Sequence, residues 1–504
     1  MAKRTRREFL EESMFATVAA LGAGSGTKVF ASQAAGGRVS ANDTINVAVI
    51  GVNGRGNAHI GAFAKTEANK ALNTVITHIV DADSAVGERR AAEVGKRQGG
   101  IVPKYVQDLR RVYDDPSVHV VSIATPNHWH SLAAIWAMQA GKDVYVEKPI
   151  SHNVSEGRRV VDASTKLNRI CQTGTQGRSS PSNIATMAFL KSGGIGDVLV
   201  SRGLCYKRRP SIGPAGVYQP PATVDYDVYC GPAPKEPVTR KQFHYDWHYL
   251  WAFGNGDLGN QGIHQMDVAR WALGVDGLAD AVISYGGRVG YVDAGETANT
   301  QVVIMPFGKK ALVFEVRGLE TGPYKDAMVG NIIEGTEGYV VIGRAAQDGG
   351  PRTAAFDKSG KLMKPLTGQG GGDGEGGHFG NFISAVRNRN RKELKADCQE
   401  GHLSSALCHL GNISYRLGEP VTPDALVSKL KTLSVSDNVQ DTFERTRTHL
   451  VDNEVDIAAT KLTLGQWITL DPANERFRDN DKANAMLTRN YRAPYIVPAN
   501  AAAI

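Results

Sequence analysis

Three residues of this sequence carry groups that could bind a hydroxyl or move a proton: Lys148, Asn260 and His264. Lys148 follows the short run 142–146, which is typical of a buried strand, so its amine is expected at the carboxyl end of that strand. An amine placed there can accept a hydroxyl proton if burial or a neighbouring positive charge lowers its pKa. The alternative is an ordinary solvated lysine. We take Lys148 as the first candidate for a catalytic base.

The second group of candidates is defined by its spacing. Asn260, His264, Asp267 and Trp271 follow one another at i, i+4, i+7 and i+11. If this segment is helical, the four side chains share one face. A histidine on such a face is more often packed in a core, but the Gly-Asn-Gly-Asp sequence at 254–257 indicates a loop at a cleft. We therefore expect Asn260, His264 and Asp267 to contact the same substrate as the lysine.

A glycine-rich turn follows the apolar run 45–50 and precedes a helical stretch. Its residues are Gly51, Asn53, Gly54, Arg55 and Gly56. The backbone N–H groups of such a turn, with the helix N-terminus, bind a pyrophosphate. Asn53 stands where the GxGxxG spacing has its middle glycine, and asparagine tolerates left-handed backbone. The alternative is a glycine-rich turn without a ligand.

A carboxylate follows the next apolar run, 74–80, and indicates which dinucleotide the turn would bind. Asp81 can accept hydrogen bonds from an adenosine ribose and repel a 2′-phosphate. The expected cofactor is therefore NAD, with NADP less favoured. The alternative is a surface aspartate.

The following strands end in further polar residues. Runs 118–124 and 142–146 alternate with helical stretches at the spacing of βαβ units, which predicts a doubly wound parallel sheet. Ligands bind at the carboxyl ends of such strands. The residues expected there are Thr125, Asn127, His130, Glu147, Lys148 and Gln176. Gln176 could instead belong to a plain interdomain turn. His128, His130 and His152 could suggest a metal site, but no further ligands stand at suitable spacing, and we expect no metal.

From residue 173 onward, expected strands follow one another with few helices between them. They are 198–205, 278–289, 297–305 and 311–316. This pattern predicts an antiparallel sheet in an α+β domain. We expect a nucleotide domain over 44–172, a substrate and oligomerisation domain over 173–430, and an extension over 431–504 that packs on the body. The basic loop 207–210 is expected to be solvated, with a phosphate site as the alternative, and the glycine-dense segment 368–377 is expected to be mobile.

The sequence resembles the Gfo/Idh/MocA family (glucose–fructose oxidoreductase, inositol dehydrogenase and relatives) over roughly residues 44–425. The segments that carry the resemblance are 51–56, Thr125-Pro126-Asn127 with His130, 140–142, Glu147-Lys148-Pro149 and 259–267. The resemblance implies a Rossmann-type domain followed by an α+β domain with a large, mainly antiparallel open sheet. It also implies that Lys148 is catalytic and that His264 binds substrate. Many relatives carry an aspartate four residues before that histidine. Asn260 cannot accept a proton in its place, so its expected role is to orient a hydroxyl.

These features predict an NAD(P)-dependent oxidoreductase that transfers hydride between a nicotinamide cofactor and a hydroxyl of a sugar, sugar derivative or cyclitol. One alternative is an NAD-dependent glycoside hydrolase that works by transient oxidation and elimination. Another is a non-catalytic, NAD-containing sugar-binding protein, against which the intact Lys148 argues. The resemblance also implies a homo-oligomer.

The first 37 residues are expected to lie outside the fold. Paired arginines at 6–7 precede Phe9-Leu10 and a short, mildly apolar stretch at 14–22. This pattern resembles a twin-arginine export signal, with a disordered basic tail as the alternative. We therefore expect contact with the export machinery and a periplasmic or extracellular location, reached after the cofactor has been bound.

Composition excludes several other classes. With 41% hydrophobic and 22% charged residues the chain is of ordinary globular composition. A formal charge of +7 without a basic block argues against nucleic-acid binding. The sequence has no apolar run long enough for a permanent membrane span. Five cysteines without a CxxC pair exclude a small disulfide scaffold.

Overall fold

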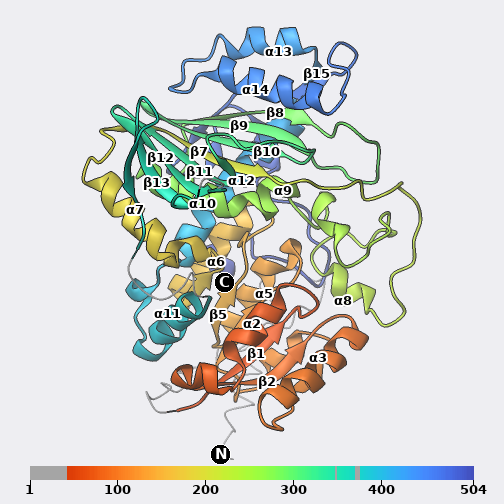
Figure 1. Cartoon of the computed structure of the whole chain (residues 1–504). Coiled ribbons are helices and arrows are strands. Elements are labelled where there is room, and N and C mark those ends of the chain that lie inside the picture. Colours follow the sequence, from red (N-terminus) through yellow and green to blue (C-terminus); the bar gives the residue numbers. More distant parts are fainter. Residues whose placement is uncertain (1–42, 347–348, 369–374) are drawn as a thin grey trace, which may run out of the picture.

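The computed structural model describes residues 43–346, 349–368 and 375–504. A smaller sheet lies at one end of the molecule, a larger sheet lies above it, and two helices cover the far side of the larger sheet (Figure 1). The proposed export signal (1–37) and most of the glycine-dense segment (368–377) lie outside the described residues.

The smaller sheet is a doubly wound parallel sheet, which confirms the expected fold class. Among the described residues its six strands are β1 (Ile45–Ile50), β2 (Thr74–Val80), β3 (Lys104–Val106), β4 (Val120–Ile123), β5 (Asp143–Val146) and β6 (Cys171–Thr173). Its covering helices are α2 (Gly56–Phe63), α3 (Ser84–Arg97), α4 (Arg110–Tyr113), α5 (Asn127–Gln139) and α6 (Val154–Lys166). The strand order is β3-β2-β1-β4-β5-β6, so the direction of winding reverses between β1 and β4. Ligands bind at the carboxyl ends of the strands beside such a reversal.

The larger sheet is mixed and mainly antiparallel. Its strands are β7 (Val198–Tyr206), β8 (Ala281–Gly287), β9 (Thr300–Phe307), β10 (Lys310–Arg317), β11 (Ala327–Gly335), β12 (Gly338–Arg344), β13 (Thr353–Asp357), β14 (Leu362–Pro365), β15 (Glu419–Val421), β16 (Leu462–Leu464), β17 (Ile468–Asp471) and β18 (Arg476–Phe477). All paired neighbours run antiparallel except β7 and β10, which are parallel. The four strands expected from the sequence are therefore present in this sheet.

The helices of the second half divide between the two domains and the interface. They are α7 (Pro181–Lys191), α8 (Tyr226–Cys230), α9 (Gly256–Asn260), α10 (Gly262–Leu273), α11 (Glu375–Asn388), α12 (Cys398–Arg416), α13 (Pro423–Leu430), α14 (Val439–Asp452) and α15 (Asp481–Ala485). Short 3₁₀ turns are η1 (Glu67–Leu72), η2 (Gln176–Ser179), η3 (Asp246–Tyr249), η4 (Arg391–Glu393) and η5 (Ala501–Ala503). Helix α11 returns to the first domain, where Phe379 and Phe382 join the core around β1.

Strand β10, in the middle of the larger sheet, is buried on both faces. Leu312, Phe314 and Val316 pack with residues of α10 and α12. Val313 points to the opposite face and packs with residues of α13 and α14, such as Phe443. Successive side chains of a strand point to opposite faces, so a strand covered on both sides must be apolar almost throughout.

The C-terminal extension does not form a separate unit beginning at residue 431. β16 pairs with β8, and β17 also pairs with β8, so the extension supplies strands to the larger sheet. The last residues reach the first domain, where the ring of Tyr495 lies edge-on to Trp129 of α5 at 5.4 Å. The extension therefore packs on the body through contacts that join residues far apart in the sequence.

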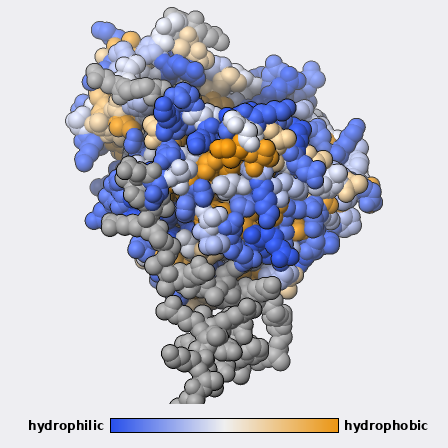
Figure 2. Space-filling view, turned by 90° about the horizontal axis from the view of Figure 1, so that it is seen from below, coloured by the Kyte–Doolittle hydropathy of each residue, from blue (hydrophilic) through white to orange (hydrophobic). Residues whose placement is uncertain are grey.

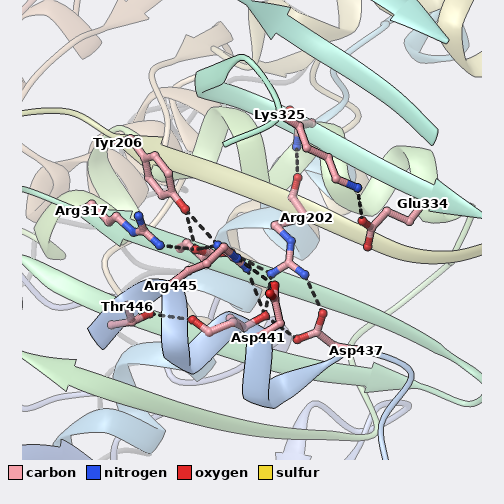
Figure 3. A network of polar contacts seen from close by, with 12 residues as sticks. Arg202, Tyr206, Arg317, Lys325, Glu334, Asp437, Asp441, Arg445 and Thr446 are labelled. Atoms are coloured by element: carbon pink, nitrogen blue, oxygen red, sulfur yellow. Dashed lines mark hydrogen bonds and ion pairs between the residues drawn. The ribbon is translucent and has the colours of Figure 1, made fainter. Parts of the chain in front are cut away.

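A buried network of charges attaches α14 to the sheet (Figure 3). Arg202 of β7 contacts Glu315 of β10 at 2.7 Å and Asp437, before α14, at 2.6 Å. Arg445 of α14 contacts the other oxygen of Glu315 at 2.8 Å. Burial alone would raise the pKa of Glu315, but the charges of Arg202 and Arg445 outweigh it and lower the pKa to about 2. Glu315 is therefore a carboxylate at neutral pH.

The outer surface of the first domain is mainly hydrophilic, with one central hydrophobic group on the face seen in Figure 2. In the described ranges, each helix is too short or too polar to cross a bilayer. All five cysteines fall within those ranges and are free, buried thiols.

Candidate active site

A cavity of about 460 Å³ lies where the carboxyl ends of the parallel strands meet the second domain. Most of the residues expected from the sequence line it. These are Gly51, Asn53, Gly54, Arg55, Asp81, Thr125, Asn127, His130, Glu147, Lys148 and Asn260. The cavity therefore coincides with the crevice that the strand order predicts.

The glycine-rich turn has the shape that a dinucleotide requires. Gly51 has a φ of +81°, and a Cβ there would lie 2.7 Å from the backbone of Ala124. A Cβ on Gly56 would lie 2.1 Å from the carbonyl oxygen of Gly51, so only glycine allows the turn to close against α2. A Cβ on Gly54 would meet no atom within 4 Å, so this side of the turn is open. Among the described residues no side chain caps the first turn of α2, although the N–H groups of Asn57 and Ala58 already donate to the carbonyl oxygens of Gly54 and Arg55.

Two polar groups farther along the cavity also fit a bound dinucleotide. The Asp81 carboxylate accepts hydrogen bonds from the backbone N–H groups of Val52, at 2.8 Å, and Asp83, at 3.0 Å, which fixes it at the end of β2. Burial raises the pKa of Asp81 more than these hydrogen bonds lower it. The hydroxyl of Thr125 is buried and has no partner within the described chain. A buried hydroxyl without a partner is costly, and a ligand in the cavity would satisfy it.

Glu147 is the centre of a buried ionic cluster beside the turn. Its carboxylate accepts hydrogen bonds from Arg55 Nε at 2.9 Å and Gln176 Nε2 at 3.2 Å, and it contacts His59 Nε2 at 3.2 Å. Burial would raise its pKa, but the hydrogen bond to His59 and the charges of Arg55 and Lys148 hold the pKa well below its usual range. Glu147 therefore stays ionised and fixes Arg55 at the cavity wall.

Gln176 does not reach the cavity, contrary to expectation. Its amide donates to Tyr145 Oη at 3.0 Å and to Glu147. Gln176 therefore supports the Glu147 carboxylate from outside the cavity lining.

Lys148 has the environment that a basic amine needs. Its Nζ donates a hydrogen bond to the backbone oxygen of Asn260 at 2.8 Å, which joins β5 to the second domain. Burial lowers its pKa; Glu147 opposes this effect, and the charges of Arg55, Lys207 and Arg209 add to it. The neutral form of the amine is therefore reached more easily than in a solvated lysine.

His264 lies near Lys148 but does not line the cavity. Burial and the positive charge of Lys148 lower its pKa to about 3, so its ring is neutral. The expected continuous helical face is absent because α9 ends at Asn260 and α10 begins at Gly262. Asn260 meets Lys148 through its backbone oxygen, whereas its side chain was expected to act.

Asp267, which was expected to contact the substrate, does not line the cavity. Its carboxylate is buried, accepts two hydrogen bonds of 2.9 Å from Arg178 Nε, and accepts one of 2.7 Å from Ser404. Trp271 covers the same arginine, with 5.3 Å from the guanidinium carbon to the ring centroid. Asp267 and Trp271 therefore both contact Arg178.

Asn127 and His130 hold the backbone around the cavity. Asn127 Nδ2 donates to Asn255 Oδ1 at 3.2 Å. The two ring nitrogens of His130 contact the carbonyl oxygens of Pro149, at 2.6 Å, and Thr125, at 2.7 Å. These contacts connect the ends of β4 and β5, so the imidazole positions the turn that carries the lysine.

Sequence reasoning missed most of the wall that the second domain contributes. Its residues include Lys207, Arg209, Tyr229, His244, Tyr245, Trp247, His248 and Gln261. The basic loop was expected to be solvated, and Lys207, Arg208 and Pro210 are exposed, the Arg208 side chain by 75%. Arg209 is held against Asp257 at 2.7 Å inside the wall. The sequence feature that could have indicated this wall is the aromatic-rich run at 243–251.

The histidines that suggested a metal do not form a site. In the part of the chain that the structure describes, no three His, Cys, Asp or Glu side chains gather to hold an ion. His128 contacts the carbonyl oxygen of Tyr229 at 2.9 Å.

Comparison with known families agrees with this geometry. Residues 45–175 match an oxidoreductase family with an NAD-binding Rossmann fold, and residues 214–303 match the C-terminal alpha/beta domain of an oxidoreductase family. Both descriptions are those of the Gfo/Idh/MocA group. The first matched segment contains the parallel sheet, and the cavity described above lies at the carboxyl ends of its strands.

Similar proteins extend the comparison. The chain is 30% identical over 195 residues to levoglucosan dehydrogenase of Pseudarthrobacter phenanthrenivorans, covering 38% of this chain and 42% of that protein. It is 26% identical over 160 residues to a glycosyl hydrolase family 109 protein of a Shewanella species, covering 31% and 34%. The matches thus span less than half the length of these relatives. The solved WlbA dehydrogenase from Bordetella pertussis, in complex with NADH and UDP-GlcNAcA, shares the fold, with a TM-score of 0.54 and 19% identity over 74% of this chain and 97% of that one.

Proposed function

We propose that this protein is an NAD-dependent oxidoreductase that acts on a hydroxyl of a sugar, sugar derivative or cyclitol. The observation that carries the proposal is the placement of a partly buried lysine amine, with a lowered pKa, in the cavity that begins at the dinucleotide turn. The relatives named for sugar chemistry support the substrate class.

Different residues along the cavity would contact different parts of the cofactor and the substrate. The turn at 51–56 would hold the pyrophosphate, Asp81 the adenosine ribose, and Thr125 and Asn127 the region near the nicotinamide. When bound, NAD supplies the hydride acceptor or donor. Lys148, in its neutral form, accepts the proton of the substrate hydroxyl and later releases it to solvent. The backbone oxygen of Asn260 fixes the direction of the amine, and His264, which lies near Lys148 outside the cavity lining, is neutral.

Mass spectrometry of the native protein, followed by assays on free polyols and sugars, tests this function. Bound NAD(H) together with oxidation of a free polyol or sugar is the expected result. Protein that neither retains nor binds NAD would overturn it.

A second candidate is redox-neutral glycoside cleavage, favoured by the similarity to family 109 proteins. In this reaction a transient ketone acidifies the neighbouring C–H and permits elimination. Release of the aglycone from aryl glycosides without net NADH formation would select this candidate over simple dehydrogenation.

Asp81 is expected to decide between the two dinucleotides. Replacing Asp81 with asparagine keeps the acceptor for the Val52 N–H group but removes the charge that repels a 2′-phosphate. We expect kcat/KM with NADP to rise about tenfold relative to that with NAD. Steady-state kinetics with both cofactors measures the ratio. An unchanged ratio would show that the carboxylate does not face the ribose.

We also propose that the protein is exported by the twin-arginine route, on the strength of the residue pattern at 6–22. Changing Arg6 and Arg7 together to lysine is expected to leave the protein in the cytoplasm of the producing cell. Cell fractionation with immunodetection measures this. An unaltered distribution would contradict the proposal.

A further inference from the structure

A second cavity, of about 330 Å³, lies behind the wall of the first, and we call it the extension cavity. It lies between α12, the loop that precedes α9 and the C-terminal extension at residues 486–490. His409, Asn412 and Arg416 line it from α12, where their spacing of three and four residues places them on one face. Without the extension this cavity would lack one of its walls.

The extension cavity is separated from the active-site cavity by hydrogen-bonded side chains. Asn255 accepts from Asn127 of the active-site cavity, and it donates from Nδ2 to the backbone oxygen of His152 at 3.0 Å. Asn412 Nδ2 donates to the backbone oxygen of Asn255 at 3.0 Å. The two cavities therefore share a wall, and each has its own lining.

The lining of the extension cavity is cationic and, among the described residues, includes no carboxylate. Arg489 is only 16% exposed, and its Nη1 donates to the carbonyl oxygen of Ala252 at 2.9 Å. Its Nε and Nη2 are buried without a hydrogen-bond partner in the described chain. Glu156 forms an ion pair with Nε at 3.7 Å but no hydrogen bond with it, because its oxygens accept from the His152 N–H and from Asn153. Buried guanidinium donors without an acceptor are costly, so this arrangement favours a bound anion.

The remaining lining suits a polyhydroxylated ring. His152 Nε2 and His409 Nδ1 are buried and have no partner within the described residues. Burial keeps both rings neutral by lowering their pKa values, that of His409 to about 3. Each unpartnered nitrogen can therefore exchange a hydrogen bond with a hydroxyl. Trp251 offers an aromatic surface, and the guanidinium carbon of Arg416 lies 4.9 Å from its ring centroid.

We propose that the extension cavity is a binding site for a sugar acid, with the carboxylate on Arg489 and Arg416 and the hydroxyls on His152 and His409. A planar guanidinium binds a carboxylate through two parallel hydrogen bonds, which makes arginine suited to this group. This site is additional to the proposed dehydrogenase site and does not depend on it.

Isothermal titration of the full-length protein with D-glucuronate, D-glucose and inorganic phosphate tests the proposal. Glucuronate is expected to bind at least about tenfold more tightly than either of the other two, because only it presents both a carboxylate and ring hydroxyls. Arg489→Gln and Arg416→Gln should each weaken glucuronate binding about tenfold. Arg447→Gln, an exposed change on α14, is the matched control and should leave binding unchanged.

The remaining outcomes decide against the proposal. Phosphate binding as tight as glucuronate binding would mean that the cavity recognises anions without the sugar. Arg416→Gln removes no hydrogen bond between described residues. If this variant binds glucuronate as tightly as the parent protein does, the extension cavity is not the binding site. That conclusion would hold even if Arg489→Gln failed to fold. Binding should persist in Lys148→Ala, and its loss there would assign the acid to the active-site cavity. None of these binding measurements requires turnover. A failure of the dehydrogenase proposal can therefore be distinguished from a failure of this one.

Discussion

Lys148→Ala is expected to lower kcat/KM for the hydroxyl substrate by a factor of about 10² to 10⁴, the usual contribution of a general base. NAD binding should be preserved, since the turn at 51–56 and Asp81 would hold the dinucleotide. Stopped-flow or steady-state kinetics measures turnover, and nicotinamide fluorescence measures binding. Lys191→Ala, at the exposed end of α7, is the matched control. Turnover that survives Lys148→Ala would refute the mechanism.

The pH dependence gives a second readout of the same amine. In the direction of hydroxyl oxidation Lys148 must be neutral, so kcat/KM should rise with pH and level off above the lysine pKa. Burial and the charges of Arg55, Lys207 and Arg209 place that pKa below the ordinary value of 10.5. Removing one of these charges by Lys207→Gln should raise the pKa of Lys148 and move the rising limb to higher pH. If Lys148 had a purely structural role, Lys207→Gln would not shift the rising limb of the pH profile.

Glu315→Gln is expected to lower the free energy of unfolding by about 3–5 kcal/mol, the usual cost of breaking a buried ion pair from one side. The amide leaves Arg202 and Arg445 buried between β7, β10 and α14 without their shared carboxylate. Urea denaturation followed by tryptophan fluorescence measures the change. Glu334→Gln is the control, since its pair with Lys325 is about 30% exposed and should contribute less than about 1 kcal/mol.

The same network predicts a dependence of stability on pH. The folded pKa of Glu315, about 2, lies below its ordinary value of 4.5. Its contribution is therefore fully present above about pH 4.5 and is lost as the pH falls toward 2, when the folded carboxylate takes up a proton. The Glu315→Gln variant should lose less stability than the parent protein over this range. Similar losses in Glu315→Gln and Glu334→Gln at neutral pH would show that the network does not hold α14 to the sheet.

The parts of the site that sequence reasoning located correctly are those built by short segments. The turn at 51–56 follows β1 directly, and its glycines are required by backbone contacts at that turn. Glu147 and Lys148 follow β5 directly, and a parallel strand with both faces covered is recognisable from its apolar run. Asp81 follows β2 in the same way. In each case neighbouring residues determine the local geometry, and the parallel sheet then brings the strand ends together.

Tertiary structure decided the remaining features because they depend on residues far apart in the chain. Asp267 has the spacing of a site residue, but Arg178, 89 positions earlier, takes its carboxylate. Gln176 likewise donates a hydrogen bond to Glu147, which lies far from it in the sequence. The aromatic wall at 245–248, the strands of the extension and the extension cavity all arise where separate segments pack together. The sequence alone determined which strand ends carry reactive groups, whereas long-range packing determined which of those groups face a ligand, since burial and partner charges come from other segments.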